Sequence, residues 1–389
     1  MKIAVKAVIV GIILFSFLFF EQFLELPPDT AMLYPGMSSD EISAHIDSLV
    51  YAYYENISSS VDSLLTRVIR KNAPGAAVAV IQNGRFLHKK GYGLADLRTK
   101  QPVQPETCFM LASVSKQFTA MAIMILKEEG KIAYEDTLPK FFPEVPRGWK
   151  TITVKHLLTH TSGIPDRFYL IGYAEGYTNQ DILDRLIQTR YLDFMPGTKH
   201  KYSNSGYNLL AMIVEKVSGQ PFREFLKERI FDPLGMHNTV VYDETEPVIE
   251  NRAIGYKQSG RGYRPNDFLL WTSGSSGIFS NVEDLFKWDQ CLYTEKLVSA
   301  ETLKEAFSPH ARVDRRENYG YGWRITANEG SKAVYHAGSL GGAHTIIFRV
   351  PEKRFTIILL ANVEIRSRKR LIRSITELYH PGLIENLWF

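Results

Sequence analysis

The sequence is poor in cysteine and has little excess of charge of either sign. Cys108 and Cys291 are the two cysteines among 389 residues, so a disulfide framework or a cysteine-rich zinc site is excluded, while a single bridge between them stays open. The net charge of +4 is spread along the chain, and we expect no nucleic-acid partner. Apolar (45%) and charged (23%) residues have soluble-protein proportions, which exclude a disordered or multi-span membrane protein.

Several common catalytic signatures are also absent from the sequence. It contains no G-x-S-x-G, H-E-x-x-H, P-loop or complete G-x-G-x-x-G motif, which disfavours α/β-hydrolase, zincin and nucleotide-binding functions. His156 and His160 are four residues apart on an expected helix, but no third ligand is identifiable nearby. We interpret them as structural histidines and expect no metal site.

One long apolar run is present, at the N-terminus. Residues 7–20 are uncharged and follow two lysines, which is typical of an export signal. No small-x-small cleavage site follows, so a cleaved signal and an uncleaved anchor formed by residues 3–20 both remain open. We expect an exported, periplasmic or extracytoplasmic protein, with residues 1–26 as signal or membrane anchor and 27–36 as a linker.

The remaining chain, residues 37–389, is too long for one hydrophobic core of ordinary size, so two lobes are expected. Apolar residues at helical spacing predict one or two helices over 42–69. Asn83-Gly84 between two strand-like runs predicts a β-hairpin. Helical patterns then dominate from Leu111 to about Val241, strands return near the C-terminus, and a last helix is expected over about 366–379.

These patterns predict an α+β fold. Neither the early hairpin nor the late strands would be stable alone, so we expect one antiparallel sheet built from N- and C-terminal strands and flanked by helices. The mainly helical lobe is an insertion into it. The predicted α/β lobe comprises residues 37–110 and 275–389, and the helical lobe comprises 111–274.

The pair Ser113 and Lys116 is the first candidate for chemistry. It opens a predicted apolar helix, and residues at i and i+3 share one helix face. A serine hydroxyl becomes a good nucleophile when a neighbouring base accepts its proton. A lysine amine can be that base if burial lowers its pKa from about 10.4 toward neutrality. A helix-capping serine beside a surface lysine is the alternative interpretation, because Ser-x-x-Lys also occurs by chance.

Two later motifs favour catalysis. Tyr202-Ser203-Asn204 precedes an apolar helix, and His336-Ala337-Gly338 ends a predicted strand. The order S-x-x-K, Y-x-N and H-x-G resembles that of the serine β-lactamase and penicillin-binding-protein superfamily, in particular its class C, DD-peptidase and esterase branch. The resemblance covers about Pro74 to Val363. Supporting stretches are ITVKHLLTHTSGIPD, PGTKHKYSNSGYNLL, SSGIFSNVEDLFKW and YGYGW.

The resemblance implies a role for each matching residue. Ser113 would be the acylated nucleophile, Lys116 its proton partner and Tyr202 a second acid/base. Asn204 would hydrogen-bond the substrate. His336 would line the opposite wall of the site. Gly338 would precede Ser339, whose N–H would complete an oxyanion hole with the N–H of Ser113. A turn that caps the next helix is the alternative for Tyr202 and Asn204.

The implied enzyme is a serine hydrolase that needs no metal or organic cofactor. Its substrate would be a small molecule or peptide: an ester, a D-amino-acid peptide or a β-lactam. His336 stands where many β-lactamases have lysine, and a largely neutral imidazole attracts a carboxylate less, so we expect esterase or peptidase activity before β-lactamase activity. The alternative function is a penicillin- or peptidoglycan-binding sensor without turnover.

A basic cluster marks the start of the last predicted helix. A contact with anionic lipid is one interpretation, given the N-terminal apolar run. A solvated helix face is the more common meaning of such a run, and we expect it here. Its members are Arg366, Arg368, Lys369, Arg370 and Arg373.

Overall fold

The computed structural model describes residues 37–166, 176–245, 247–328 and 331–383. The expected N-terminal signal or anchor and most of the expected linker lie outside these ranges. Within them, no helix is both long and apolar enough to cross a membrane. The chain divides into two compact units, Met1–Asp62 and Ser63–Phe389. The division falls inside helix α3 (Ser39–Val68), which is one continuous helix where one or two were expected.

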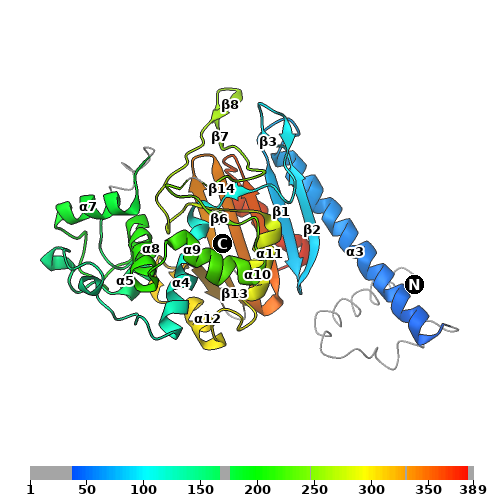
Figure 1. Ribbon diagram of the computed structural model, residues 1–389. Coiled ribbons are helices and arrows are strands. Elements are labelled where there is room, and N and C mark those ends of the chain that lie inside the picture. Colours follow the sequence, from blue (N-terminus) through cyan, green and yellow to red (C-terminus); the bar gives the residue numbers. More distant parts are fainter. Residues whose placement is uncertain (1–36, 167–175, 246, 329–330, 384–389) are drawn as a thin grey trace. The chain divides into compact units, whose positions relative to one another are not determined.

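An eight-stranded antiparallel sheet lies at the centre of the larger unit (Figure 1). The last strand of the chain pairs with the first, with Ala76 opposite Ala361, which confirms the predicted sheet built from both ends of the sequence. In spatial order its strands are β10 (Ala311–Arg312), β11 (Asn318–Tyr319), β12 (Arg324–Asn328), β13 (Ser331–Leu340), β14 (Ala343–Val350), β15 (Phe355–Ala361), β1 (Ala76–Gln82) and β2 (Arg85–Tyr92).

The predicted hairpin joins β1 to β2. Asn83 and Gly84 both have positive φ, 50° and 73°, as a tight turn between twisted strands requires. Strand β1 is buried along its whole length, as are β15 and most of β14. Buried apolar strands of this kind form the core of the α+β fold that the sequence predicts.

Helices and small sheets fill the chain between β2 and β10. Helices α4 and α8 pack against each other, and α5, α7 and α9 lie on α8. The described helices are η1 (Ala112–Ser115), α4 (Lys116–Glu128), η2 (Leu138–Lys140), η3 (Arg147–Trp149), α5 (Val154–Leu158), α7 (Asn179–Thr189), α8 (Asn204–Ser218), α9 (Phe222–Leu226), η4 (Lys227–Phe231), α10 (Asp232–Leu234), α11 (Val282–Cys291) and α12 (Ala300–Ala306), with η5 (Pro351–Lys353) and α13 (Arg368–Tyr379) later in the chain.

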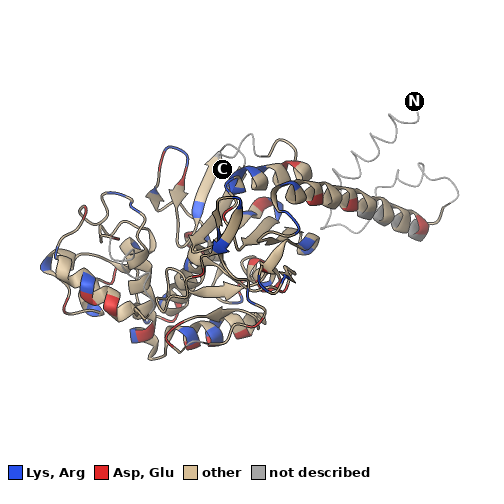
Figure 2. Cartoon of the chain, turned by 90° about the horizontal axis from the view of Figure 1, so that it is seen from above, with Lys and Arg blue, Asp and Glu red and all other residues tan. Residues whose placement is uncertain are grey.

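The remaining strands form small ribbons. They are β3 (Leu94–Asp96) with β4 (Gln101–Pro102), β5 (Phe109–Met110) with β9 (Ile278–Ser280) and β6 (Val240–Val241), and β7 (Tyr256–Ser259) with β8 (Gly262–Pro265). Basic and acidic residues are both distributed over the described elements, in keeping with the small net charge (Figure 2).

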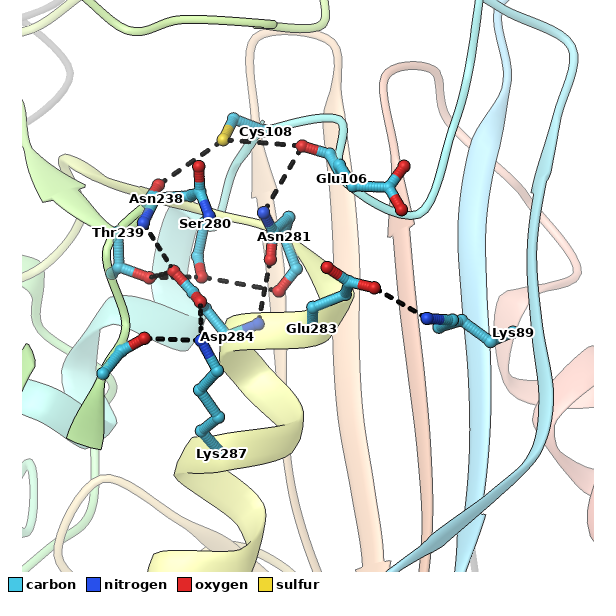
Figure 3. Close-up of polar contacts among 11 residues, drawn as sticks. Lys89, Glu106, Cys108, Asn238, Thr239, Ser280, Asn281, Glu283, Asp284 and Lys287 are labelled. Carbon is cyan, nitrogen blue, oxygen red and sulfur yellow. Dashed lines mark hydrogen bonds and ion pairs between the residues drawn. The ribbon is translucent and has the colours of Figure 1, made fainter.

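Both cysteines are free and buried, so the bridge that the sequence left open does not form. The Cys108 thiol donates to the carbonyl oxygen of Asn238 at 3.4 Å. The N–H of Asn238 in turn donates to the Asp284 carboxylate, at the start of α11 (Figure 3). Burial raises the pKa of Cys108 to about 12, so this thiol is a packing group and not a nucleophile.

Strand β13 has an edge that positions the site. Strand β12 pairs with its first half, from Ser331 to Tyr335, and does not continue along the second half. The second half contacts η1, the short helix that leads into α4, and η1 also contacts β14. The turn before α4 is therefore held against these two strands of the sheet.

Candidate active site

Ser113 lies in η1, one turn before α4, and its side chain is half-buried and therefore accessible to a small molecule. The amine Nζ of Lys116 donates to Ser113 Oγ at 3.3 Å. The predicted face shared by these residues thus brings the hydroxyl and the amine into direct contact.

The backbone just before Ser113 is strained. Ala112 has φ +50°, a left-handed conformation that costs a residue with a Cβ of the order of 1 kcal/mol. Ala112 is completely buried. Packing around it holds the conformation that turns Ser113 toward Lys116.

Lys116 is completely buried, although it carries an amine. Its Nζ donates to Asn204 Oδ1 and to the carbonyl oxygen of Ser275, each at 2.8 Å. Burial lowers the pKa of Lys116 to about 7; Asp166 opposes this effect and Arg324 adds to it. The amine is therefore suited to accept and return a proton near neutral pH.

Asp166 fixes the orientation of Asn204, the first residue of α8. One carboxylate oxygen accepts from the Asn204 side-chain Nδ2 and the other from its backbone N–H, each at 3.1 Å. With its nitrogen bound to Asp166, the Asn204 amide turns its oxygen toward Lys116. Sequence reasoning missed Asp166; the available signal was its place at the end of the stretch 152–166.

Tyr202 lies beside the same amine. Nζ of Lys116 is 4.8 Å from the centroid of the Tyr202 ring, and the guanidinium of Arg324 is 5.7 Å from it. The ring of His160 packs on Tyr202 with 4.2 Å between centroids. His160 Nδ1 also accepts from the N–H of Ser203 at 3.1 Å, so this histidine supports the loop that carries Tyr202.

Ser203 caps α8 by accepting from the N–H of Gly206 at 3.3 Å. The helix-capping alternative for the Tyr202 loop is thus a real structural role. It is compatible with a catalytic role because the cap uses Ser203, while Tyr202 and Asn204 face Lys116.

His336 lies inside the protein with 1% of its surface exposed. Its Nδ1 is 3.0 Å from the carbonyl oxygen of Ala337, which can only accept, so Nδ1 carries the proton and Nε2 accepts from the Tyr319 hydroxyl at 2.9 Å. Burial lowers the pKa of His336 well below its usual value. The imidazole is neutral and supplies no charge to the site.

Gly338 allows β13 to approach η1. A Cβ at this position would lie 2.2 Å from the carbonyl oxygen of Leu111 and 2.4 Å from Thr345 Oγ1. The next residue, Ser339, is exposed. The two candidate oxyanion donors, the N–H groups of Ser113 and Ser339, therefore come from elements that are in contact.

Replacing Gly338 by alanine should lower the free energy of unfolding by about 1–3 kcal/mol and reduce kcat, because the new methyl group must push β13 away from η1. Urea unfolding and ester-hydrolysis rates measure both effects. Gly148→Ala is the matched control, since a Cβ there meets no atom within 4 Å. Equal stability and kcat in both variants would contradict the close contact.

The two histidines noted as candidate metal ligands have structural partners. His156 Nδ1 accepts from the N–H of Thr153 at 3.2 Å and completes a capping box on α5, while His160 supports Ser203. In the ranges that the structure describes, no group of three or more histidine, cysteine or acidic side chains is arranged to hold a metal ion.

A comparison of the chain with models of known protein families identifies its family. The model described as Beta-lactamase matches residues 55–379, most of the chain. The chain belongs to the beta-lactamase family. It is therefore a serine hydrolase of the β-lactamase and penicillin-binding-protein type, as the motif order predicted.

Individual relatives agree with this assignment. Penicillin-binding protein 4* of Bacillus subtilis is 32% identical over 333 residues, which cover 80% of this chain and 73% of the relative. The octameric penicillin-binding protein homologue from Pyrococcus abyssi has a TM-score of 0.76 and 29% identity, covering 86% of this chain and 79% of that one. The D-amino acid amidase from Ochrobactrum anthropi, at 22% identity and a TM-score of 0.74 over 83% of this chain and 98% of its own, shares the fold.

Proposed function

We propose that this member of the beta-lactamase family hydrolyses its substrate through an acyl-enzyme on Ser113. The observation that carries the proposal is the 3.3 Å contact between Ser113 Oγ and the fully buried amine of Lys116, whose pKa is lowered to about 7 by burial. An amine with that pKa can take the hydroxyl proton as the oxygen attacks a carbonyl carbon.

In the acylation step, Ser113 Oγ bonds to the carbonyl carbon while its proton moves to neutral Lys116. The carbonyl oxygen becomes an oxyanion that accepts from the N–H groups of Ser113 and Ser339. When the intermediate collapses, the bond to the leaving group breaks, and Tyr202 delivers the proton that this group needs. A water molecule then attacks the acyl carbon and gives a proton to the deprotonated Tyr202. The bond to Ser113 Oγ breaks, Lys116 returns its proton to that oxygen, and the acid is released.

We expect an uncharged ester to be the preferred substrate. The neutral, enclosed His336 offers no positive charge to a substrate carboxylate, which disfavours a β-lactam and also a D-amino-acid peptide that ends in a free carboxylate next to the scissile bond. A nitrocefin, D-Ala-D-Ala peptide and p-nitrophenyl ester panel, ranked by kcat/KM, tests this order. A highest value for nitrocefin or for the peptide would overturn it.

Labelling with a fluorophosphonate tests the nucleophile directly. We expect one adduct per chain, which mass spectrometry of the digested protein places on the peptide containing Ser113. Steady-state turnover of an ester by the same preparation supports the hydrolase. Stoichiometric labelling without turnover would support the sensor alternative, and an adduct on another peptide would overturn the assignment of Ser113.

We also propose that residues 1–26 direct export of the protein, on the evidence of the apolar run at 7–20 that follows two lysines. Fractionation of cells expressing the tagged full chain should find it outside the cytoplasm. A variant without residues 1–26 should remain inside. An equal distribution of the two proteins would refute the export proposal.

A further inference from the structure

Arg368 differs from the other basic residues at the start of α13. The expected solvated face is correct for Arg366, Lys369, Arg370 and Arg373, which are exposed. Arg368 is half-buried instead, and its Nη1 donates to two backbone carbonyl oxygens, those of Gly338 on β13 and Thr345 on β14, each at 2.8 Å. The guanidinium thus joins the two strands at the level of the candidate oxyanion hole.

The direction of the Gly338–Ser339 peptide follows from this contact. A trans peptide carries its C=O and N–H in opposite directions. The Gly338 carbonyl points to Arg368, which also binds Thr345 on β14, so the Ser339 N–H points away from β14. That direction leads to the edge of β13 beyond its pairing with β12, on a strand that also contacts η1.

Within the described residues, no carboxylate forms an ion pair with Arg368. Among the ion pairs of residues 37–166, 176–245, 247–328 and 331–383, none includes Arg368. Burial lowers its pKa to about 10, which leaves the guanidinium protonated at neutral pH. A cation that has lost part of its hydration and has no ion-pair partner among the described residues is costly, so a favourable use for it is expected.

We propose that Arg368 is a positioning residue for the oxyanion hole, which aligns the Gly338–Ser339 peptide and polarises it so that the Ser339 N–H becomes a stronger hydrogen-bond donor. A cation that donates a hydrogen bond to the carbonyl oxygen draws electron density through the peptide group, and the N–H of that peptide becomes a stronger donor. The oxyanion that forms during acylation benefits more than the neutral carbonyl of the substrate. This inference rests on the proposed function of Ser113.

Thr345 connects the same guanidinium to the segment that carries Ser113, the second candidate donor of the oxyanion hole. While its carbonyl accepts from Arg368, its hydroxyl Oγ1 donates to the carbonyl oxygen of Leu111 at 2.7 Å. Leu111 lies two residues before Ser113, which supplies the second candidate oxyanion donor. One cation therefore helps to fix the positions of both candidate oxyanion donors, the N–H groups of Ser113 and Ser339.

Arg368→Met tests the proposal, because methionine keeps much of the side-chain volume and removes the charge and the donors. With p-nitrophenyl acetate, an uncharged substrate, we expect kcat to fall by about 10- to 30-fold, less than the 100- to 1000-fold cost of removing an oxyanion donor outright. KM should change by less than about twofold, since the interaction strengthens in the transition state. Arg368→Lys, which keeps a charged donor, should restore most of kcat.

A spectroscopic signature separates polarisation from a merely structural role. The carbonyl stretch of the acyl-enzyme, measured by infrared difference spectroscopy, should move to higher wavenumber in Arg368→Met and return toward the wild-type value in Arg368→Lys. Arg370→Met, an exposed change on the same helix, is the matched control and should alter neither kcat nor the carbonyl band. Circular dichroism establishes that each variant is folded.

Each outcome bears on the proposal. An unchanged kcat and carbonyl band in folded Arg368→Met, or a KM increase confined to substrates with a carboxylate, would overturn the role of Arg368 while leaving the Ser113 acyl-enzyme intact. If Arg368→Met does not fold, Arg368→Lys decides the question. The proposal is overturned if the carbonyl band of Arg368→Lys equals that of the wild type while its kcat is reduced 10-fold or more. A wild-type protein that forms no acyl-enzyme overturns both proposals.

Discussion

Replacing Ser113 by alanine is expected to lower kcat for ester hydrolysis by about 10⁴-fold or more and to abolish fluorophosphonate labelling. The methyl group cannot form the covalent intermediate, so only transition-state binding by the remaining groups is left, as in serine proteases that lose their nucleophile. Steady-state rates with p-nitrophenyl acetate and mass spectrometry of the labelled protein measure the two effects.

Ser339→Ala is the matched control for this variant. Ser339 is exposed, and the proposed mechanism uses its backbone N–H, which alanine retains. We expect its kcat to stay within about threefold of wild type. Activity and labelling that survive in Ser113→Ala would show that another residue is the nucleophile, and a large loss in Ser339→Ala would assign chemistry to its hydroxyl.

Lys116→Met and Lys116→Arg are both expected to lower kcat/KM by about 10³-fold or more. In the proposed mechanism, the rate of acylation depends on the neutral amine that contacts Ser113 Oγ. Methionine has no base at all. Arginine keeps a cation and hydrogen-bond donors but stays protonated at any usable pH, so the pair of variants separates proton transfer from charge and packing.

The pH dependence of kcat/KM in the wild type also tests the role of Lys116. With its usual pKa of about 10.4, roughly one Lys116 side chain in 2500 would be neutral at pH 7. A pKa lowered to about 7 makes about half of them neutral. Because the neutral form is the active base in the proposed mechanism, kcat/KM should rise about tenfold per pH unit below pH 7 and level off above it.

Two results would contradict the role of Lys116. One is a kcat/KM that stays constant between pH 5 and pH 8 for an uncharged ester. The other is an Arg variant that retains more than about a tenth of wild-type activity while its circular dichroism is native.

Local patterns predicted the parts of the site that depend on neighbours in sequence. Ser113 and Lys116 are three residues apart, so helix geometry alone placed them together. Asn83-Gly84 predicted its hairpin for the same reason, since the turn is set by two residues. The motif order supplied Tyr202 and Asn204, which helix periodicity alone would have left as a cap.

Residues that act through distant contacts could not be found in this way. Asp166 orients Asn204 from 38 positions earlier in the chain, and Arg368 reaches Gly338 from 30 positions later. In sequence, Arg368 is one of several basic residues in a short run, and its inward turn is decided by how α13 packs. The capping box of His156 likewise depends on its rotamer and not on its spacing from His160.

The pairing of β1 with β15 has a consequence for how the molecule is made. Strand β1 has a partner on one side, β2, as soon as the hairpin is synthesised, but its other partner, β15, is complete only when Ala361 has been added. Such long-range closure slows folding, and the proposed nucleophile lies in the segment enclosed by it. A ribosome-bound chain should therefore be enzymatically inactive until Ala361 has emerged.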